Sequence, residues 1–127
     1  MKFYIHMPFC VRKCLYCDFY SSADISRSDE YASAVLKEAE SYRGCSAETI
    51  YIGGGTPTTL EPDQLRRLLN QLGESFGFDG VLEFTVEAGR PDSITREKLE
   101  VIREFPVTRI SVNPQTMKQE TLDIIGR

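Results

Sequence analysis

The sequence predicts an α/β fold with about four parallel βα units. Strand-like and helix-like segments alternate four times along the 127 residues. The strand-like segments recur at spacings of about 25 to 45 residues, which leaves room for a right-handed crossover helix between parallel neighbours. These segments are also mostly apolar on both faces, as is typical of parallel strands that are covered on both sides.

The first unit begins with a strand over residues 2–6, where aromatic and β-branched residues dominate. A loop with three cysteines leads from it to a helix predicted over residues 28–42. Ser28 is placed to cap this helix, and Asp29 and Glu30 lie where the helix dipole favours negative charge. The apolar residues of one face recur at helical spacing: Tyr31, Val35, Leu36 and Ala39.

The second unit has a strand over residues 49–52 and a helix that starts near Pro62, a residue suited to a first helical turn. One face of that helix is apolar and carries Leu65, Leu68, Leu69, Leu72 and Phe76. Gly77 and Gly80 then mark a turn before the third strand, which is predicted over residues 82–86.

Thr95 is placed to cap the third helix, and Pro106 follows its end. The apolar face of this helix carries Leu99, Ile102 and Phe105. The fourth strand is predicted over residues 109–112 and a last helix over residues 118–125. Four strands do not close a parallel barrel, and an open half barrel leaves two unpaired edges. We therefore expect residues 1–127 to be the N-terminal portion of a longer domain, with an open sheet as the alternative.

The composition narrows the function classes. The net charge is −4, and no basic stretch exceeds two adjacent residues, which argues against a nucleic-acid partner. No apolar run approaches the roughly 20 residues of a membrane span, and the N-terminus does not resemble a signal peptide. We expect a cytoplasmic protein. Its four cysteines are then more suited to metal binding or redox chemistry than to disulfides.

Unusual residues follow each of the four predicted strands. The cysteine loop follows the first strand, the Gly53-Gly54-Gly55 run follows the second, Glu87 follows the third, and Asn113-Pro114-Gln115 follows the fourth. Active sites of parallel α/β folds form at the carboxyl ends of the strands. The sequence therefore predicts one site that gathers these four segments.

Cys10, Cys14 and Cys17 follow the pattern C-x3-C-x2-C. Three thiolates from one loop can hold three irons of a cubane iron–sulfur cluster and leave the fourth iron open to a ligand that is not protein. By spacing alone, a zinc site completed by His6 or Cys45 is equally compatible, and plain core cysteines are a third interpretation.

The aromatic residues of the same loop, Phe9, Tyr16 and Phe19, are expected to shield a cluster from water. Cys45 lies beside Gly44, away from the other cysteines, and is better explained as an unpaired, partly buried thiol. His6 is the only histidine and is expected to be hydrogen-bonded near the site rather than to bind metal.

The glycine run lacks both the G-x-G-x-x-G spacing of dinucleotide sites and the lysine of a P-loop. It allows either a close approach of a ligand amine to the backbone or a tight turn. Glu87 could bind a ribose diol or form an ion pair at the end of its strand. Gln115 and Arg127 could hold a carboxylate of a ligand. Alternatively, Gln115 is an ordinary loop amide and Arg127 is a solvated charge.

Three segments together resemble the radical S-adenosylmethionine superfamily: residues 4–10 (YIHMPFC), 14–19 (CLYCDF) and 51–57 (YIGGGTP). More narrowly, they resemble the oxygen-independent coproporphyrinogen III oxidase (dehydrogenase) family. Residues 85–88 (TVEA) and 109–115 (RISVNPQ) continue the resemblance in order, so that it spans essentially the whole chain. It implies the first part of a partial TIM-like barrel.

The resemblance implies a 4Fe–4S cluster on Cys10, Cys14 and Cys17, with S-adenosylmethionine on the open iron. The implied contacts to this cofactor are Tyr4, Tyr16, Gly54, Gly55, Thr56, Glu87, Gln115 and Arg127. In the family, reductive cleavage of the sulfonium gives a 5′-deoxyadenosyl radical, which starts the oxidative decarboxylation of porphyrinogen propionates to vinyl groups. A flavodoxin or ferredoxin is implied as the electron donor, and a porphyrinogen or haem as the ligand.

The sequence departs from the best-known oxidase branch in two ways. Phe19 stands where that branch has a further cysteine, and it is similar to relatives that are haem chaperones. Residues 87–91 (EAGRP) and 113–117 (NPQTM) are more similar to a divergent dehydrogenase branch. The alternative to an oxidase is therefore a haem chaperone that binds the cluster and S-adenosylmethionine without oxidase activity.

Overall fold

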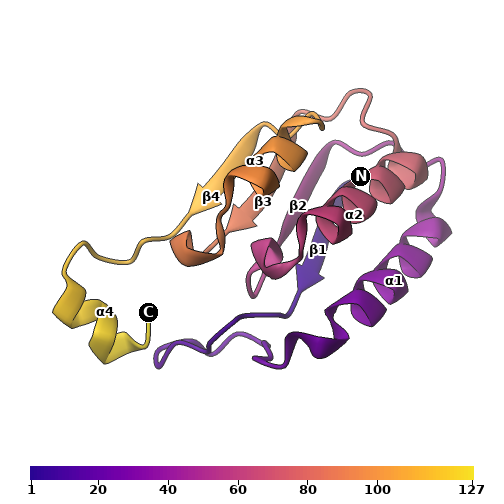
Figure 1. The fold of residues 1–127 in the computed structure, drawn as a ribbon. Coiled ribbons are helices and arrows are strands. Elements are labelled where there is room, and N and C mark those ends of the chain that lie inside the picture. Colours follow the sequence, from indigo (N-terminus) through magenta and orange to yellow (C-terminus); the bar gives the residue numbers. More distant parts are fainter.

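The computed structural model describes residues 1–127 and has four parallel strands side by side in chain order (Figure 1). The strands are β1 (Lys2–Met7), β2 (Thr49–Gly54), β3 (Glu83–Ala88) and β4 (Arg109–Val112). Each neighbouring pair is parallel, so all four carboxyl ends lie at the same end of the sheet. The predicted α/β fold with four βα units is confirmed.

Three helices cover one face of this sheet: α1 (Ser28–Ala39), α2 (Pro62–Phe76) and α3 (Arg96–Arg103) (Figure 1). The last helix, α4 (Gln119–Ile125), lies beyond the sheet, next to the cysteine loop. Pro62 opens α2 as predicted, and a capping box between Glu61 and Gln64 fixes its start. None of the helices combines the length and the apolar character that crossing a bilayer requires.

The hydrophobic core lies between the sheet and these helices. The helix-facing side chains of β1, β2 and β3 are buried, and they include Ile5, Met7, Ile50, Ile52, Phe84 and Val86. The predicted apolar face of α2 packs against them, and its four leucines are completely buried. Each such leucine stabilises the fold by about 1.5–3 kcal/mol.

The second face of the sheet differs from the prediction that both faces are apolar. Its side chains alternate with the core residues and are mostly polar: Tyr4, His6, Tyr51, Glu83, Thr85, Glu87 and Arg109. They pair across the strands, as when Arg109 Nε donates to Thr85 Oγ1 over 3.0 Å. The sheet is therefore apolar towards the helices and polar on the opposite face.

Three strands run further than predicted, and β1 does so by one residue, Met7. Gly53 and Gly54 continue β2 because they pair with His6 and Met7. Glu87 lies within β3 rather than after it, because it pairs with Ser111 of β4. Consequently, Gly54 and Glu87 lie within the last two positions of their strands rather than in the loops that follow.

The start of α1 also differs from the prediction. Ser28 is not its cap, since a 3₁₀ turn over Ile25–Arg27 leads directly into the helix. Asp24 caps that turn by accepting a hydrogen bond from the Ser26 backbone N–H. The helix ends at Ala39, and a second 3₁₀ turn continues it.

Helix α3 buries Lys98, whereas the predicted core residue Leu99 is 39% exposed. Lys98 is only 8% exposed, and its Nζ donates to the backbone oxygens of Thr58 at 2.7 Å and Ser93 at 3.3 Å. The hydroxyls of Thr58 and Ser93 lie 2.6 Å apart. Lys98 thus joins the turn after β2 to the turn after β3.

The turn after β2 packs directly on the start of the cysteine loop. Gly55 N–H donates to Met7 O over 2.8 Å, and Thr56 N–H donates to Phe9 O over 2.7 Å. A Cβ atom on Gly55 would lie 2.6 Å from Phe9 O and 2.8 Å from Phe9 N, which is too close. Glycine is required here because two backbone segments touch.

Replacing Lys98 tests its connection between the turn after β2 and the turn after β3. Lys98→Met leaves two buried carbonyl oxygens without their donor, and we expect the free energy of unfolding to fall by about 2 kcal/mol. Urea unfolding measures this loss. Lys37→Met, on the exposed side of α1, is the matched control and should stay within about 0.5 kcal/mol of the parent. Equal urea midpoints for Lys98→Met and Lys37→Met would contradict this stabilising role of Lys98.

Replacing Gly55 tests the contact between the turn after β2 and the start of the cysteine loop. Gly55→Ala forces two backbone segments apart, and we expect a loss of about 3 kcal/mol in urea unfolding. Gly44→Ala is the control. Gly44 has a φ of +84°, and nothing lies within 4 Å of the position that a Cβ atom would take there. The substitution therefore reports the cost of the backbone conformation alone. That cost is about 1 kcal/mol. A smaller loss for Gly55→Ala than for Gly44→Ala would refute the contact.

Candidate functional site

The cysteine loop is closed at its base by the backbone. Cys10 N–H donates to Ser22 O over 2.9 Å, and Ser22 N–H donates to Pro8 O over 2.6 Å. Farther out, Leu15 N–H donates to Ile125 O over 3.1 Å, which attaches the tip of the loop to α4. The loop therefore projects as a lobe beyond the carboxyl end of β1, held at its base and at its tip.

One pocket gathers residues from the loop and from the ends of β2, β3 and β4. All three loop cysteines line it. So do seven of the eight residues that were predicted to contact a cofactor: Tyr16, Gly54, Gly55, Thr56, Glu87, Gln115 and Arg127. Segments that are more than 100 residues apart, such as Cys10 and Arg127, thus line the same pocket.

Tyr4 is the predicted cofactor residue that does not line this pocket. Its hydroxyl lies 3.1 Å from His6 Nδ1, and its ring stacks on Tyr51 with 5.8 Å between centroids. Partial burial, and then the charge of Glu87, raise the pKa of Tyr4 above its usual value. Tyr4 therefore lies on the polar face of the sheet, outside the pocket.

Glu87 connects two strand ends. Its Oε2 accepts from Gly54 N–H over 3.3 Å, and its Oε1 accepts from Asn113 Nδ2 over 3.3 Å. No cation lies within ion-pair distance of Glu87, so the predicted alternative of a strand-end ion pair is not found. The carboxylate is instead held by two N–H donors in the pocket wall.

Arg127 and Gln115 close the pocket on the side of α4. Arg127 Nη2 donates to the backbone oxygens of Gly89, over 2.6 Å, and Asn113. Its Nη1 lies 3.8 Å from Cys14 Sγ, so Arg127 is not the solvated charge of the alternative prediction. Gln115 has a φ of +68°, a left-handed conformation that costs a non-glycine residue about 1–3 kcal/mol.

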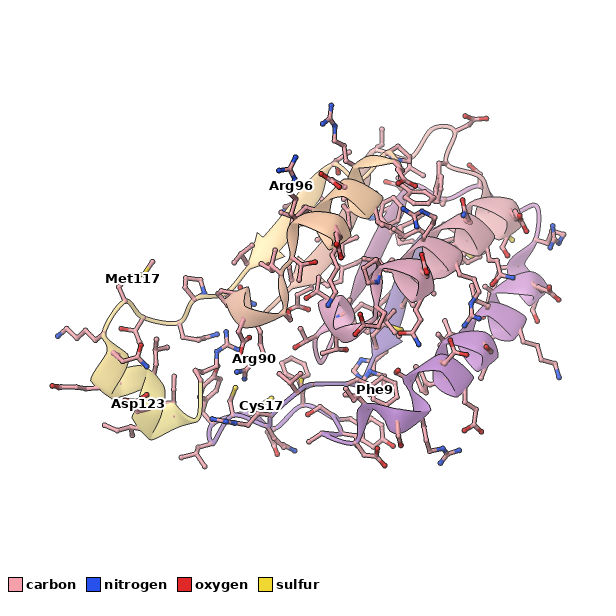
Figure 2. The ribbon with its side chains drawn as sticks, in the orientation of Figure 1. Phe9, Cys17, Arg90, Arg96, Met117 and Asp123 are labelled. Atoms are coloured by element: carbon pink, nitrogen blue, oxygen red, sulfur yellow. The ribbon has the colours of Figure 1, made fainter.

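Arg90 is a site residue that sequence reasoning missed. It comes from the loop after β3, lies beside the cysteine loop near Cys17 (Figure 2), and is only 4% exposed. Its Nη1 approaches Cys14 Sγ at 3.6 Å, while Nε and Nη2 bind the two carboxylate oxygens of Asp92. The Arg90 guanidinium lowers the pKa of Asp92. An arginine in a loop has no periodic pattern that would reveal its burial.

The sulfur atoms have different surroundings. Cys14 is buried, whereas Cys10 and Cys17 are half-buried. Cys10 Sγ lies 3.4 Å from Thr56 Oγ1. Burial, and then the Cys14 side chain, raise the pKa of Tyr16. The three sulfurs thus share a polar pocket that contains hydroxyl and guanidinium donors.

The surroundings of the three sulfurs are compatible with an iron–sulfur cluster. No three histidine, cysteine or acidic side chains converge closely enough to hold one metal ion. The two ring nitrogens of His6 are engaged with Tyr4 Oη and Tyr20 O. A cubane spreads its three thiolates over three irons, so the sulfurs need not meet at one point, and guanidinium donors suit its anionic sulfurs.

The expected aromatic shield is formed only in part, because Tyr16 and Phe19 line the cysteine pocket and Phe9 does not. Phe9 is buried, but it packs edge-on against Tyr31 of α1, with 5.5 Å between ring centroids, rather than over the cysteines. Tyr16 is 53% exposed and Phe19 is 65% exposed. Cys45 is a free, half-buried thiol outside the pocket, as predicted.

Known proteins are similar to this chain in sequence. The chain is 38% identical to the oxygen-independent coproporphyrinogen-III oxidase-like protein HemZ of Bacillus subtilis, over all of this chain and 27% of that protein. It is 39% identical to the heme chaperone HemW of Lactococcus lactis, over 98% of this chain and 33% of that protein. The chain thus spans about a third or less of the length of these curated relatives.

The fold has a solved counterpart as well. The structure of coproporphyrinogen III oxidase (HemN) from Escherichia coli superposes with a TM-score of 0.84 at 26% identity, over 98% of this chain and 30% of that one. The family model of the Radical SAM superfamily matches residues 4–127. That match begins within β1, at Tyr4, and includes every residue of the pocket. The chain belongs to the radical SAM superfamily.

Proposed function

We propose that this chain forms the part of a radical S-adenosylmethionine enzyme that holds a 4Fe–4S cluster and S-adenosylmethionine. The observation that carries this proposal is the convergence of Cys10, Cys14 and Cys17 with the ends of β2, β3 and β4 in one pocket. For the complete protein we propose oxidative decarboxylation of coproporphyrinogen III propionates to vinyl groups. A cytoplasmic location and reduction by a flavodoxin or ferredoxin belong to the same proposal.

The side chains of the pocket suit distinct tasks. Cys10, Cys14 and Cys17 would hold the cluster, which supplies the electron for the reductive cleavage of S-adenosylmethionine. The Glu87 carboxylate is fixed by Gly54 N–H and Asn113 Nδ2, so it can accept hydrogen bonds from a ribose diol without moving. These residues bind and orient the cofactor, and the reactivity itself comes from the cofactor.

The carboxylate of the cofactor needs a cationic partner. Arg127 is anchored through Nη2 to two carbonyl oxygens, which orients its guanidinium in the pocket. Gln115 lines the same side of the pocket and offers an amide. We assign both residues to the carboxylate of S-adenosylmethionine, and the glycine-lined end of β2 to its amine.

A haem chaperone is the second candidate. A relative named as a heme chaperone is as similar to this chain as the oxidase-like relative. Phe19 also stands where the oxidase branch has a further cysteine. Both candidates use the same cluster and cofactor, so they differ only in what happens to the tetrapyrrole.

Cofactor cleavage tests the shared part of the proposal. After anaerobic reconstitution and reduction, we expect the complete protein that contains this chain to bind iron and sulfide and to release 5′-deoxyadenosine, detected by chromatography. Cys17→Ala should lose iron and reduce the product to background, because a cluster ligand is gone. Cys45→Ala is the matched control and should retain both. One zinc and no iron in anaerobically purified protein would exclude the proposal.

The tetrapyrrole distinguishes the two candidates. With coproporphyrinogen III and S-adenosylmethionine, an oxidase is expected to release carbon dioxide and form vinyl products, measured by mass spectrometry. A chaperone is expected instead to bind haem stably in a titration without decarboxylation. If S-adenosylmethionine is cleaved but neither decarboxylation nor haem binding is seen, both proposed tetrapyrroles are rejected and the proposed cluster site is retained.

A further inference from the structure

We propose that Arg90 is a positioning residue for Cys14, and that its guanidinium raises the reduction potential of the cluster that this cysteine helps to hold. This inference rests on the proposed function, since it presupposes a cluster on the three cysteines. Arg90 itself is not one of the residues that the family resemblance assigns. Its role follows from its burial, its partners and its distance to one sulfur.

The guanidinium of Arg90 is fixed before any cofactor binds. Asp92 accepts from Nε over 3.0 Å and from Nη2 over 2.8 Å, which is a bidentate pair. The remaining nitrogen, Nη1, lies 3.6 Å from Cys14 Sγ and 3.5 Å from Arg12 O. The pair thus directs one N–H group at the sulfur and at the backbone of the cysteine loop.

The surrounding backbone keeps this pair in place. Ser93 Oγ donates to Arg90 O over 2.7 Å, and the same hydroxyl lies 2.6 Å from Thr58 Oγ1. Lys98 Nζ donates to the backbone oxygens of Thr58 and Ser93. The backbone of Arg90 is therefore held by a buried network that joins the turn after β2 to α3, while Asp92 holds its guanidinium.

The three cysteines are not equivalent in this arrangement. Cys14 is the buried one, and it has Arg90 on one side and Arg127 Nη1 at 3.8 Å on the other. Cys10 has a neutral hydroxyl, Thr56 Oγ1, at 3.4 Å. No charged side chain lies within hydrogen-bonding distance of Cys17 Sγ. The sulfur at Cys14 is therefore the one whose negative charge is most strongly stabilised.

This asymmetry has an electrostatic consequence. Reduction adds one negative charge to a cluster, and a nearby cation stabilises the reduced form more than the oxidised form. Hydrogen bonds to cluster sulfurs and the local charge are the established determinants of such potentials. Because Arg90 is buried, its effect on Cys14 is only weakly screened by solvent. Arg90 therefore makes the cluster easier to reduce.

The test measures iron content and the reduction potential of the complete protein, the latter by potentiometric titration followed by EPR. Arg90→Met keeps most of the packing and removes the charge, so we expect a more negative potential with the iron content retained. Arg90→Lys keeps the charge, and we expect its potential to lie between those of Arg90→Met and the parent. These potentials are read without turnover, so loss of activity alone cannot produce them.

Arg66→Met is the matched control. Arg66 also forms a bidentate pair, with Glu104 at 3.0 and 2.9 Å, but it does not line the cysteine pocket. Its removal should leave the potential unchanged. An Arg90→Met variant that retains iron at the parent potential would overturn the proposal.

Two further outcomes are separated by the same data. If Arg90→Met does not retain iron, the potential is read from Arg90→Lys, which keeps the charge but loses the N–H that the bidentate pair directs at Cys14 Sγ. A negative shift in Arg90→Lys supports the proposal, and an unchanged potential refutes it. If the parent protein binds no iron–sulfur cluster at all, the proposed function itself fails, and the inference about Arg90 falls with it.

Discussion

Parallel pairing of the four strands is the constraint on which the rest of this structure depends. Because neighbours run in the same direction, the residues that end each strand lie at one end of the sheet. Glu87 can then reach Gly54 of one neighbour and Asn113 after the other. The helices bury only one face, which leaves the opposite face for polar side chains.

The cysteine loop is held by these strand ends as well as by hydrogen bonds within its own backbone. Gly55 and Thr56 donate to the backbone at its start, and Arg90 and Arg127 approach Cys14 from two other loops. The charged groups nearest to Cys14 Sγ are therefore supplied by the loops after β3 and α4. The cysteine loop supplies the three sulfurs and part of the pocket lining around them.

Local patterns in the sequence predicted the strands, the helices and the pocket well, because period and spacing are local properties. The leucines of α2 and the cap at Thr95 are examples. The errors arose where a distant partner decides the outcome. Lys98 is buried because carbonyl oxygens of two other turns accept its hydrogen bonds, and Arg90 is buried because Asp92 and Cys14 accept those of its guanidinium. Neither set of partners is visible in the periodicity around these residues.

The order of the chain has a consequence for biosynthesis. The three cysteines are made first, but their supports come from residues up to 113 positions later. A ribosome adds residues one by one, and domains form from the N-terminus onward. The nascent loop therefore leaves the ribosome without Thr56, Arg90 or Arg127 beside it. The surroundings of the three cysteines are consequently complete only after translation of the fourth strand and the helix after it.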